Sequence, residues 1–143
     1  SQKAISFIAG YSCFNDGSIR DWQRHTHQFL PGKNFSATAP FGPELVTPEE
    51  LGPLESLQIE TRLNGVVMQS ALLGEMIFSV AEIIEYISTF ITLDPGDVIA
   101  TGTPGGVGSK REPQIFMKSG DTVEVIVEGV GHLINDVVEE PVS

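Results

Sequence analysis

One predicted hairpin constrains the fold of this chain more than any other feature. Residues 57–63, LQIETRL, alternate apolar and polar side chains, which is the pattern of a half-buried β-strand. Asn64-Gly65 follows directly, and this dipeptide favours the type I′ turn that joins two antiparallel strands. The segment VVMQ then supplies the second strand. The sequence therefore predicts an antiparallel sheet built around this hairpin.

The clearest predicted helix covers residues 79–93. Ser79 and Glu82 have the spacing of a capping box at its start. Asp94-Pro95-Gly96 ends the segment, because proline disfavours helical backbone at the residue before it. Apolar residues recur at helical spacing between these limits, at Val80, Ile83, Ile84, Ile87, Phe90 and Ile91. We therefore expect one principal helix with one apolar face.

The remaining segments are predicted as strands and loops. Ala4–Gly10 is predicted as a short buried strand, and residues 29–53 as a long loop rich in proline and glycine. Residues 93–102 and 117–129 each place Gly-Asp in a turn before a β-branched run, and HLINDVVEE is predicted as the last strand. No βαβ series is present, so a doubly wound parallel sheet is not expected. The predicted class is a mixed, β-rich α+β domain.

Composition narrows the possible partners. The 143 residues fit one domain with one core, and 19 acidic against 8 basic residues give a net charge of −11. This charge disfavours nucleic acid and anionic membranes as partners. No apolar stretch is long enough for a transmembrane helix, and no signal sequence opens the chain. Cys13 is the single cysteine, so no disulfide can form within the chain, and we expect a reducing, cytoplasmic setting. Its neighbours in YSCFN are not cationic, so we expect Cys13 to pack as a small apolar residue rather than to act as a nucleophile.

The stretch NDGSIRDWQ is the first candidate site. Asp16, Arg20 and Gln23 lie at i, i+4 and i+7, so a continuous helix would place them on one face. The Asp16 carboxylate is the type of ligand that Mg²⁺ prefers, and Arg20 can bind either a substrate carboxylate or Asp16 itself. The alternative is a solvated helix start, with Ser18 as the N-cap and Asp21 as the acidic partner of a capping box.

Two loops carry further candidates. Lys33 lies in PGKNF, where proline, glycine and aromatic neighbours can aim the ammonium inward; the alternative is an ordinary exposed lysine. The segment TGTPGGVG, residues 101–108, follows the predicted strand DVIA. Its glycines let backbone N–H groups turn toward an anion, and its threonine hydroxyls add donors. Because it lacks the P-loop and dinucleotide spacings, a tight loop between strands is the alternative.

The histidines predict no metal or nucleophile site of their own. His25 and His27 lack the further ligands of a zinc set and are expected in solvent, while His132 is expected to be structural. Asp97 and Asp121 follow glycine and are interpreted as turn residues. No serine lies in a G-x-S-x-G motif, so a serine hydrolase has no support.

Taken together, these segments resemble the fumarylacetoacetate hydrolase family, in its catalytic C-terminal domain. The resemblance covers nearly the whole chain in the family's order, through GYSCFNDGSIRDWQ, PGKNF, FGPELVT, LNGVVMQ, EMIFSVAEIIEYIS, LDPGDVIATGTPGGVG and KSGDTVEVIVEGVG. It implies a β-sandwich roll of mixed sheets, usually a homodimer, that binds Mg²⁺, Mn²⁺ or Ca²⁺. The implied activity is metal-dependent hydrolysis of a carbon–carbon bond in a β-diketo acid such as an acylpyruvate. A 2-oxo acid decarboxylase, hydratase or isomerase is one alternative, and an inactive truncated scaffold is another.

The resemblance also implies a role for each candidate residue. Asp16 matches the family's aspartate ligand of the metal, and Lys33 matches the lysine that faces the substrate oxygens. Arg20 and Gln23 match groups that reach the substrate or order the ligand shell. Gly102–Thr103 match the loop that holds a substrate carboxylate.

One part of the family pattern lies outside this sequence. In the family, a Glu-x-Glu pair upstream of the strand before NDGSIRD supplies two further metal ligands, and an acid/base His and Glu lie further upstream. None of these positions is among residues 1–143. We therefore expect a single catalytic domain that is N-terminally incomplete, carries one metal ligand of three, and binds the metal weakly by itself.

Overall fold

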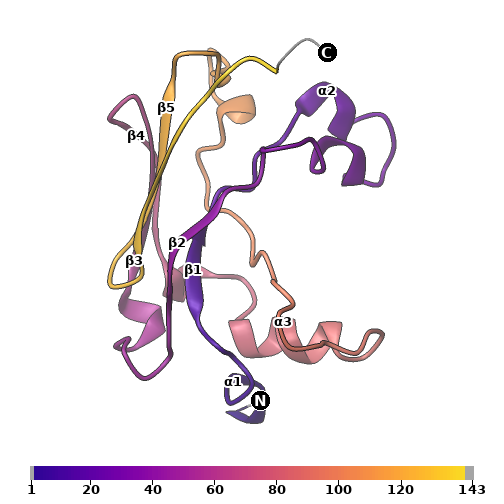
Figure 1. The fold of residues 1–143 in the computed structure, drawn as a ribbon, viewed down its shortest axis with the longest axis vertical. Coiled ribbons are helices and arrows are strands. Elements are labelled where there is room, and N and C mark those ends of the chain that lie inside the picture. The colour runs from indigo at the N-terminus through magenta and orange to yellow at the C-terminus, as the bar shows by residue number, and fades with distance from the viewer. Residues whose placement is uncertain (1, 141–143) are drawn as a thin grey trace.

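The structure is a computed structural model that describes residues 2–140, and it contains two antiparallel sheets with few helices (Figure 1). The longer elements in chain order are α1 (Gln2–Ile5), β1 (Tyr11–Phe14), α2 (Arg20–Gln23), β2 (Phe41–Val46), β3 (Gln58–Leu63), β4 (Val66–Leu72), α3 (Val80–Ile87), β5 (Thr122–Val127) and β6 (Gly131–Asp136). Four short 3-10 turns, η1 (Leu30–Gly32), η2 (Leu54–Ser56), η3 (Leu73–Glu75) and η4 (Gly108–Lys110), lie in the connections. The predicted mixed, β-rich class is confirmed.

The hairpin predicted from residues 57–69 is confirmed and lies in the larger sheet. β3 and β4 pair antiparallel up to Leu63 and Val66, and the turn residues Asn64 and Gly65 have φ of 51° and 77°. Positive φ at both positions is the backbone of a type I′ turn. The four-stranded sheet has the order β4-β3-β5-β6, so the hairpin pairs through β3 with β5, and β5 pairs in turn with β6.

The core lies between this sheet and the two-stranded sheet of β1 and β2. Alternate residues of β5 are buried, and β6 lies against both β1 and β2. The buried cluster consists of Cys13, Leu57, Val125, Val127, Val130 and Leu133. Cys13 is 1 % exposed and donates its thiol hydrogen to the Gly131 carbonyl, and burial raises the pKa of this thiol. Its predicted packing role is confirmed.

The principal helix begins where predicted but ends earlier. The Ser79 hydroxyl accepts from the Glu82 N–H, and the Glu82 carboxylate accepts from the Ser79 N–H, so the capping box is confirmed. The helix stops at Ile87 rather than Leu93, and the Thr89 hydroxyl donates to the Tyr86 carbonyl in the turn that follows. Such side-chain bonds to the backbone compete with helical hydrogen bonds and favour termination.

Three predicted segments differ from the structure. Ala4–Gly10 is not a strand, since Ala4 and Ile5 end α1 and the next residues form a turn. The prediction was wrong because a short apolar run does not by itself distinguish a helix from a strand. The loop predicted for residues 29–53 contains β2, whose internal Pro43 obscures the strand pattern. DVIA, at residues 97–100, has no regular structure, since none of the described strands pairs with it.

The described helices are all short. Within residues 2–140, none has the combination of length and hydropathy that a membrane crossing requires. The longest of them, α3, packs against α1 at the end of the molecule opposite α2 (Figure 1). This arrangement leaves a space between α2 and α3 that the larger sheet borders.

Candidate active site

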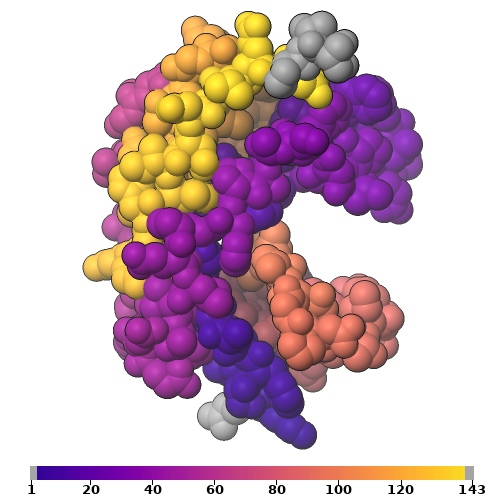
Figure 2. Space-filling model, in the orientation of Figure 1, coloured from indigo at the N-terminus to yellow at the C-terminus, as the bar shows by residue number. Residues whose placement is uncertain are grey.

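A broad cleft opens between the segment that carries α2 and the segment that carries α3 (Figure 2). Its volume is ≈ 2000 Å³. The inward face of the larger sheet lines the cleft through Ile59, Thr61, Val123 and Val125. The candidates Asp16, Arg20, Gln23, Lys33, Gly102 and Thr103 all line it as well. The structure thus brings every predicted site residue to one concave surface.

The chain leaves β1 through a tight loop that carries Asp16. Gly17 fits closely against the Thr38 carbonyl, where a Cβ would overlap that oxygen. Ser18 does not cap α2: its hydroxyl donates to the Asp16 carbonyl at 3.2 Å, and Ile19 is the N-cap without a side-chain bond. The predicted capping box of Ser18 and Asp21 is therefore wrong, because α2 begins at Arg20 and its N-cap position falls on Ile19, one residue after Ser18.

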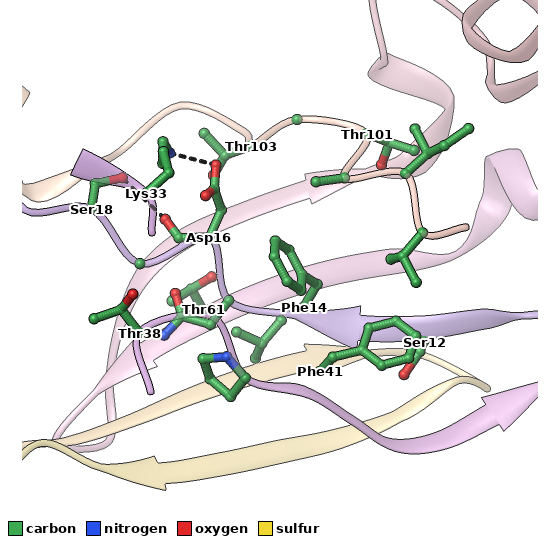
Figure 3. A pocket seen from close by; sticks show the side chains of 18 of the residues that line it. Ser12, Phe14, Asp16, Ser18, Lys33, Thr38, Phe41, Thr61, Thr101 and Thr103 are labelled. Atoms are coloured by element: carbon green, nitrogen blue, oxygen red, sulfur yellow. Dashed lines mark hydrogen bonds and ion pairs between the residues drawn. The ribbon is translucent and has the colours of Figure 1, made fainter. Parts of the chain in front are cut away.

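Asp16 and Lys33 meet in the cleft. Lys33 Nζ lies 2.5 Å from Asp16 Oδ2, and the two side chains are 27 % and 46 % exposed (Figure 3). No described residue donates a hydrogen bond to Asp16 Oδ1. The pair therefore leaves one carboxylate oxygen without a protein partner, and both side chains are partly exposed to the cleft. Lys33 points inward, as one of the two interpretations of PGKNF predicted.

Arg20 and Gln23 form a second polar pair in the same segment. Arg20 Nη1 donates to Gln23 Oε1 at 2.7 Å, and Gln23 is 8 % exposed. The predicted common helix face is only partly correct, since α2 begins at Arg20 and Asp16 lies before it. Gly32 packs on the Gln23 backbone, where a Cβ would lie 2.6 Å from the Gln23 nitrogen. This contact joins α2 to η1 and so holds Lys33 near Asp16.

The glycine-rich loop supplies the third side of the site. Gly102 has φ of 108°, which favours glycine, and both Gly102 and Thr103 are exposed in the cleft. Figure 3 shows Asp16, Lys33 and Thr103 at the same end of the pocket. The Thr103 hydroxyl accepts a hydrogen bond from Gln69 Nε2 at 2.8 Å. Gln69 lines the cleft too, and the sequence reasoning gave it no role beyond the end of a predicted strand.

The other titratable candidates behave as predicted. Asp97 accepts from the Asp94 N–H, and Asp121 accepts from the Lys118 N–H, so both are turn residues. His132 lies 2.7 Å from Glu124 on the larger sheet, outside the cleft lining. His25 and His27 are exposed and lie outside the lining as well.

The donor set for a cation is incomplete within this chain. Asp16 supplies one accessible carboxylate at the site, but no three His, Cys, Asp or Glu residues among positions 2–140 are grouped so that they could hold an ion. A cation such as Mg²⁺ is usually held by one or two carboxylates with waters and substrate oxygens. The described residues therefore fit part of a cation site rather than a closed one.

Known proteins are similar to this chain in sequence and in fold. The mitochondrial oxaloacetate tautomerase FAHD2A of Bos taurus is 45 % identical over 137 residues, which are 94 % of this chain and 44 % of that protein. The solved structure of fumarylacetoacetate hydrolase from psychrophilic Exiguobacterium antarcticum matches with a TM-score of 0.93 and 40 % identity, over 97 % of this chain and 50 % of its own. Maleylpyruvate hydrolase from Sphingobium sp. SYK-6, in complex with manganese(II) and pyruvate, has a TM-score of 0.82 and 27 % identity, over 96 % and 47 %.

These matches cover nearly the whole of this chain. The chain spans about half the length of the relatives it matches, 44 % of the tautomerase and 50 % of the hydrolase chain. The family model for the C-terminal region of fumarylacetoacetate (FAA) hydrolase matches residues 1–138. The chain therefore belongs to the fumarylacetoacetate hydrolase family.

Proposed function

We propose that this chain forms part of a metal-dependent enzyme that acts on a small 2-oxo or β-diketo acid by stabilising an enolate. One observation carries the proposal: Lys33 Nζ lies 2.5 Å from Asp16 Oδ2 in a cleft that the glycine-rich loop also lines. A cation-binding carboxylate, a fixed ammonium and a loop of backbone N–H groups are the parts that such a substrate requires. The match of residues 1–138 to the family supports the same conclusion.

Each residue has a distinct task in this proposal. Asp16 holds the divalent cation, Mg²⁺, Mn²⁺ or Ca²⁺, which when bound polarises the substrate oxygens. The Lys33 ammonium stabilises the negative charge that develops on a substrate oxygen as the enolate forms. Gly102–Thr103 bind the substrate carboxylate, and Arg20 with Gln23 orders the wall beside Asp16. The remaining carboxylates of the cation site come from outside residues 2–140.

Two reactions follow from an enolate-stabilising site. Keto–enol tautomerisation of a 2-oxo acid such as oxaloacetate is favoured by the tautomerase relative, which is 45 % identical. Hydrolysis of a carbon–carbon bond in an acylpyruvate-like acid is the second candidate, favoured by the two hydrolase structures at 40 % and 27 % identity. Both reactions develop negative charge on the same substrate oxygen, so both use Lys33.

Ultraviolet absorbance distinguishes the two reactions. The full-length, Mg²⁺-loaded protein that contains this chain is mixed either with enol oxaloacetate or with an acylpyruvate. Accelerated loss of the enol band without new acids indicates a tautomerase, and loss of the diketone band with release of two acids indicates a hydrolase. Lys33→Ala should abolish most of either rate, whereas Lys110→Ala, an exposed lysine outside the cleft lining, should leave it unchanged. No acceleration of either reaction contradicts the proposal.

The assembly and location remain predictions. The family resemblance predicts a homodimer, and the single cysteine predicts a reducing, cytoplasmic location. Light scattering of the full-length protein after size-exclusion chromatography measures its molar mass and so tests the predicted homodimer. A monomer at micromolar concentration contradicts the dimer.

A further inference from the structure

We propose that Gln69 is a positioning residue that presents the Thr103 hydroxyl as a hydrogen-bond donor to the carboxylate of the ligand. The inference rests on the proposed function and concerns a residue that the sequence patterns do not single out. Gln69 lies in β4, 34 positions before Thr103, and both side chains line the cleft. Its role follows from which atoms donate and which accept.

The orientation of the Gln69 amide is fixed by its second contact. Gln69 Nε2 lies 2.8 Å from Thr103 Oγ1 and 2.7 Å from the Pro104 carbonyl oxygen. A carbonyl oxygen can only accept a hydrogen bond, so the amide nitrogen, and not the amide oxygen, must face the loop. Both hydrogens of the Gln69 amide are then used on the loop. Thr103 Oγ1 is therefore an acceptor toward Gln69.

This assignment decides where the Thr103 hydrogen can go. A hydroxyl has one hydrogen, and Gln69 has no acceptor turned toward it. No other residue among positions 2–140 accepts a bond from Thr103, which is exposed in the cleft. An ionised carboxylate carries only acceptors. The Thr103 hydroxyl thus has a hydrogen available for the carboxylate of a 2-oxo acid, and Gln69 keeps it available.

A second contact holds the loop independently of Gln69. Arg111 Nε donates to the Gly106 carbonyl at 2.9 Å, and Arg111 Nη2 donates to the Met68 carbonyl in β4. Gly106 has φ of 105° and lies against the same Met68 oxygen. Because these bonds remain when Gln69 is replaced, a Gln69 variant changes the Thr103 hydroxyl without detaching the loop.

Four single variants of the full-length protein, and one double variant, test the inference. Gln69→Leu removes the donor, and Gln69→Glu keeps the shape but places an acceptor beside the hydroxyl. Thr103→Val removes the hydroxyl itself. Gln58→Leu is the matched control, since Gln58 lies on the same hairpin and its amide donates to the Ser70 hydroxyl at 2.9 Å, away from the cleft. Calorimetry with Mg²⁺ present measures the Kd of pyruvate for each protein.

The expected Kd values distinguish a Gln69 that acts through the Thr103 hydroxyl from a Gln69 that only stabilises the structure. Gln69→Leu and Thr103→Val should each weaken pyruvate binding by about tenfold, the loss of one hydrogen bond to a charged group. A fifth protein combines Gln69→Leu with Thr103→Val. Its Kd for pyruvate should lie within about threefold of the Kd of Thr103→Val, because both changes remove the same interaction. Gln69→Glu should bind more weakly than Gln69→Leu, since the carboxylate takes the Thr103 hydrogen. Gln58→Leu should bind like the unmodified protein.

Other results overturn the inference. Unchanged binding by Gln69→Leu, or losses that multiply in the double variant, show that Gln69 does not act through Thr103. If the unmodified protein binds pyruvate while Gln69→Leu binds equally well, the inference alone fails. If the unmodified, Mg²⁺-loaded protein binds no pyruvate at millimolar concentration, the proposed function fails and the inference fails with it.

Discussion

At the scale of single residues, the Asp16–Lys33 pair is the part of the site most easily exchanged for a ligand. Its side chains are 46 % and 27 % exposed, so the ion pair contributes at most about 1 kcal/mol to stability. A divalent cation on Asp16 and an anionic oxygen beside Lys33 can replace it at little cost. The pair therefore contributes little to folding, which is what the proposed binding roles of the two residues require.

Replacing each partner separates these roles. In the full-length protein, Asp16→Ala should abolish Mg²⁺ binding, because it removes the carboxylate that this chain contributes to the site. Lys33→Ala should retain the metal but reduce turnover by on the order of 10²-fold, because charge on the substrate oxygen is no longer stabilised. Calorimetry and steady-state rates measure the two effects. Unchanged activity in both variants refutes the site.

Asp121 predicts a pH dependence of stability. A hydrogen bond from the Asn64 side chain, and then one from the Lys118 N–H, hold the pKa of Asp121 below its ordinary value. A carboxyl whose folded pKa is lowered adds stability above its unfolded pKa and loses it as pH falls through the folded pKa. Asp121→Asn should therefore lower the free energy of unfolding of the chain at pH 7. The difference in unfolding free energy between the variant and the unmodified chain should become smaller below about pH 4.

Urea unfolding at pH 7 and at pH 3 measures this difference. Asp21→Asn is the control, since Asp21 is exposed and no described residue binds its carboxylate. If Asp121→Asn lowers the free energy of unfolding by the same amount at both pH values, the prediction is contradicted.

At the scale of elements, local signals were predictable and pairing across distance was not. Asn64-Gly65 specifies its turn, and Ser79 its helix start, within four residues of sequence. The sequence does not predict β2, because its proline weakens the local strand pattern and its partner β1 is distant in sequence. DVIA has strand composition, but a strand needs a neighbour, and the described residues offer none.

The capping box of α3 gives a prediction at this scale. Ser79→Ala removes the acceptor of the Glu82 N–H and should lower the free energy of unfolding by about 1 kcal/mol. Ser88→Ala is the control, because Ser88 follows the helix and its hydroxyl has no partner among the described residues. Denaturant unfolding measures both variants. Equal stability of the two contradicts a stabilising cap.

At the scale of the whole molecule, the cleft assembles residues that are distant in sequence. Asp16 and Lys33 are 17 positions apart, and Gln69 and Thr103 are 34 apart. The family resemblance could name Asp16, Lys33 and Thr103 because their motifs are local. It could not show that Lys33 binds Asp16, nor that Gln69 supports Thr103, because those contacts depend on how α2, η1 and β4 pack.

The incomplete donor set predicts weak metal binding by this chain alone. Asp16 is the carboxylate at the site, and no group of three possible ligands occurs among residues 2–140. Titration of Mg²⁺ into the isolated chain should therefore give a Kd weaker than micromolar, whereas the full-length protein should bind more tightly. Asp16→Ala in the isolated chain serves as the blank. Micromolar affinity of the chain by itself contradicts this division of ligands.

The inward face of β5 has a consequence for how the sequence can vary. Val125 and Val127 belong to the buried cluster, and together with Val123 they also border the cleft. One side of a single strand thus borders both the interior and the cleft, while Thr122, Glu124 and Ile126 alternate onto the other side. In a saturation mutagenesis survey, tolerance should rise and fall with a period of two along this strand. A substitution at one of the buried valines would change the cleft and the core at the same time, so it must also preserve folding. Changes in substrate specificity should therefore arise more readily in the loops around Lys33 and Thr103 than on this strand.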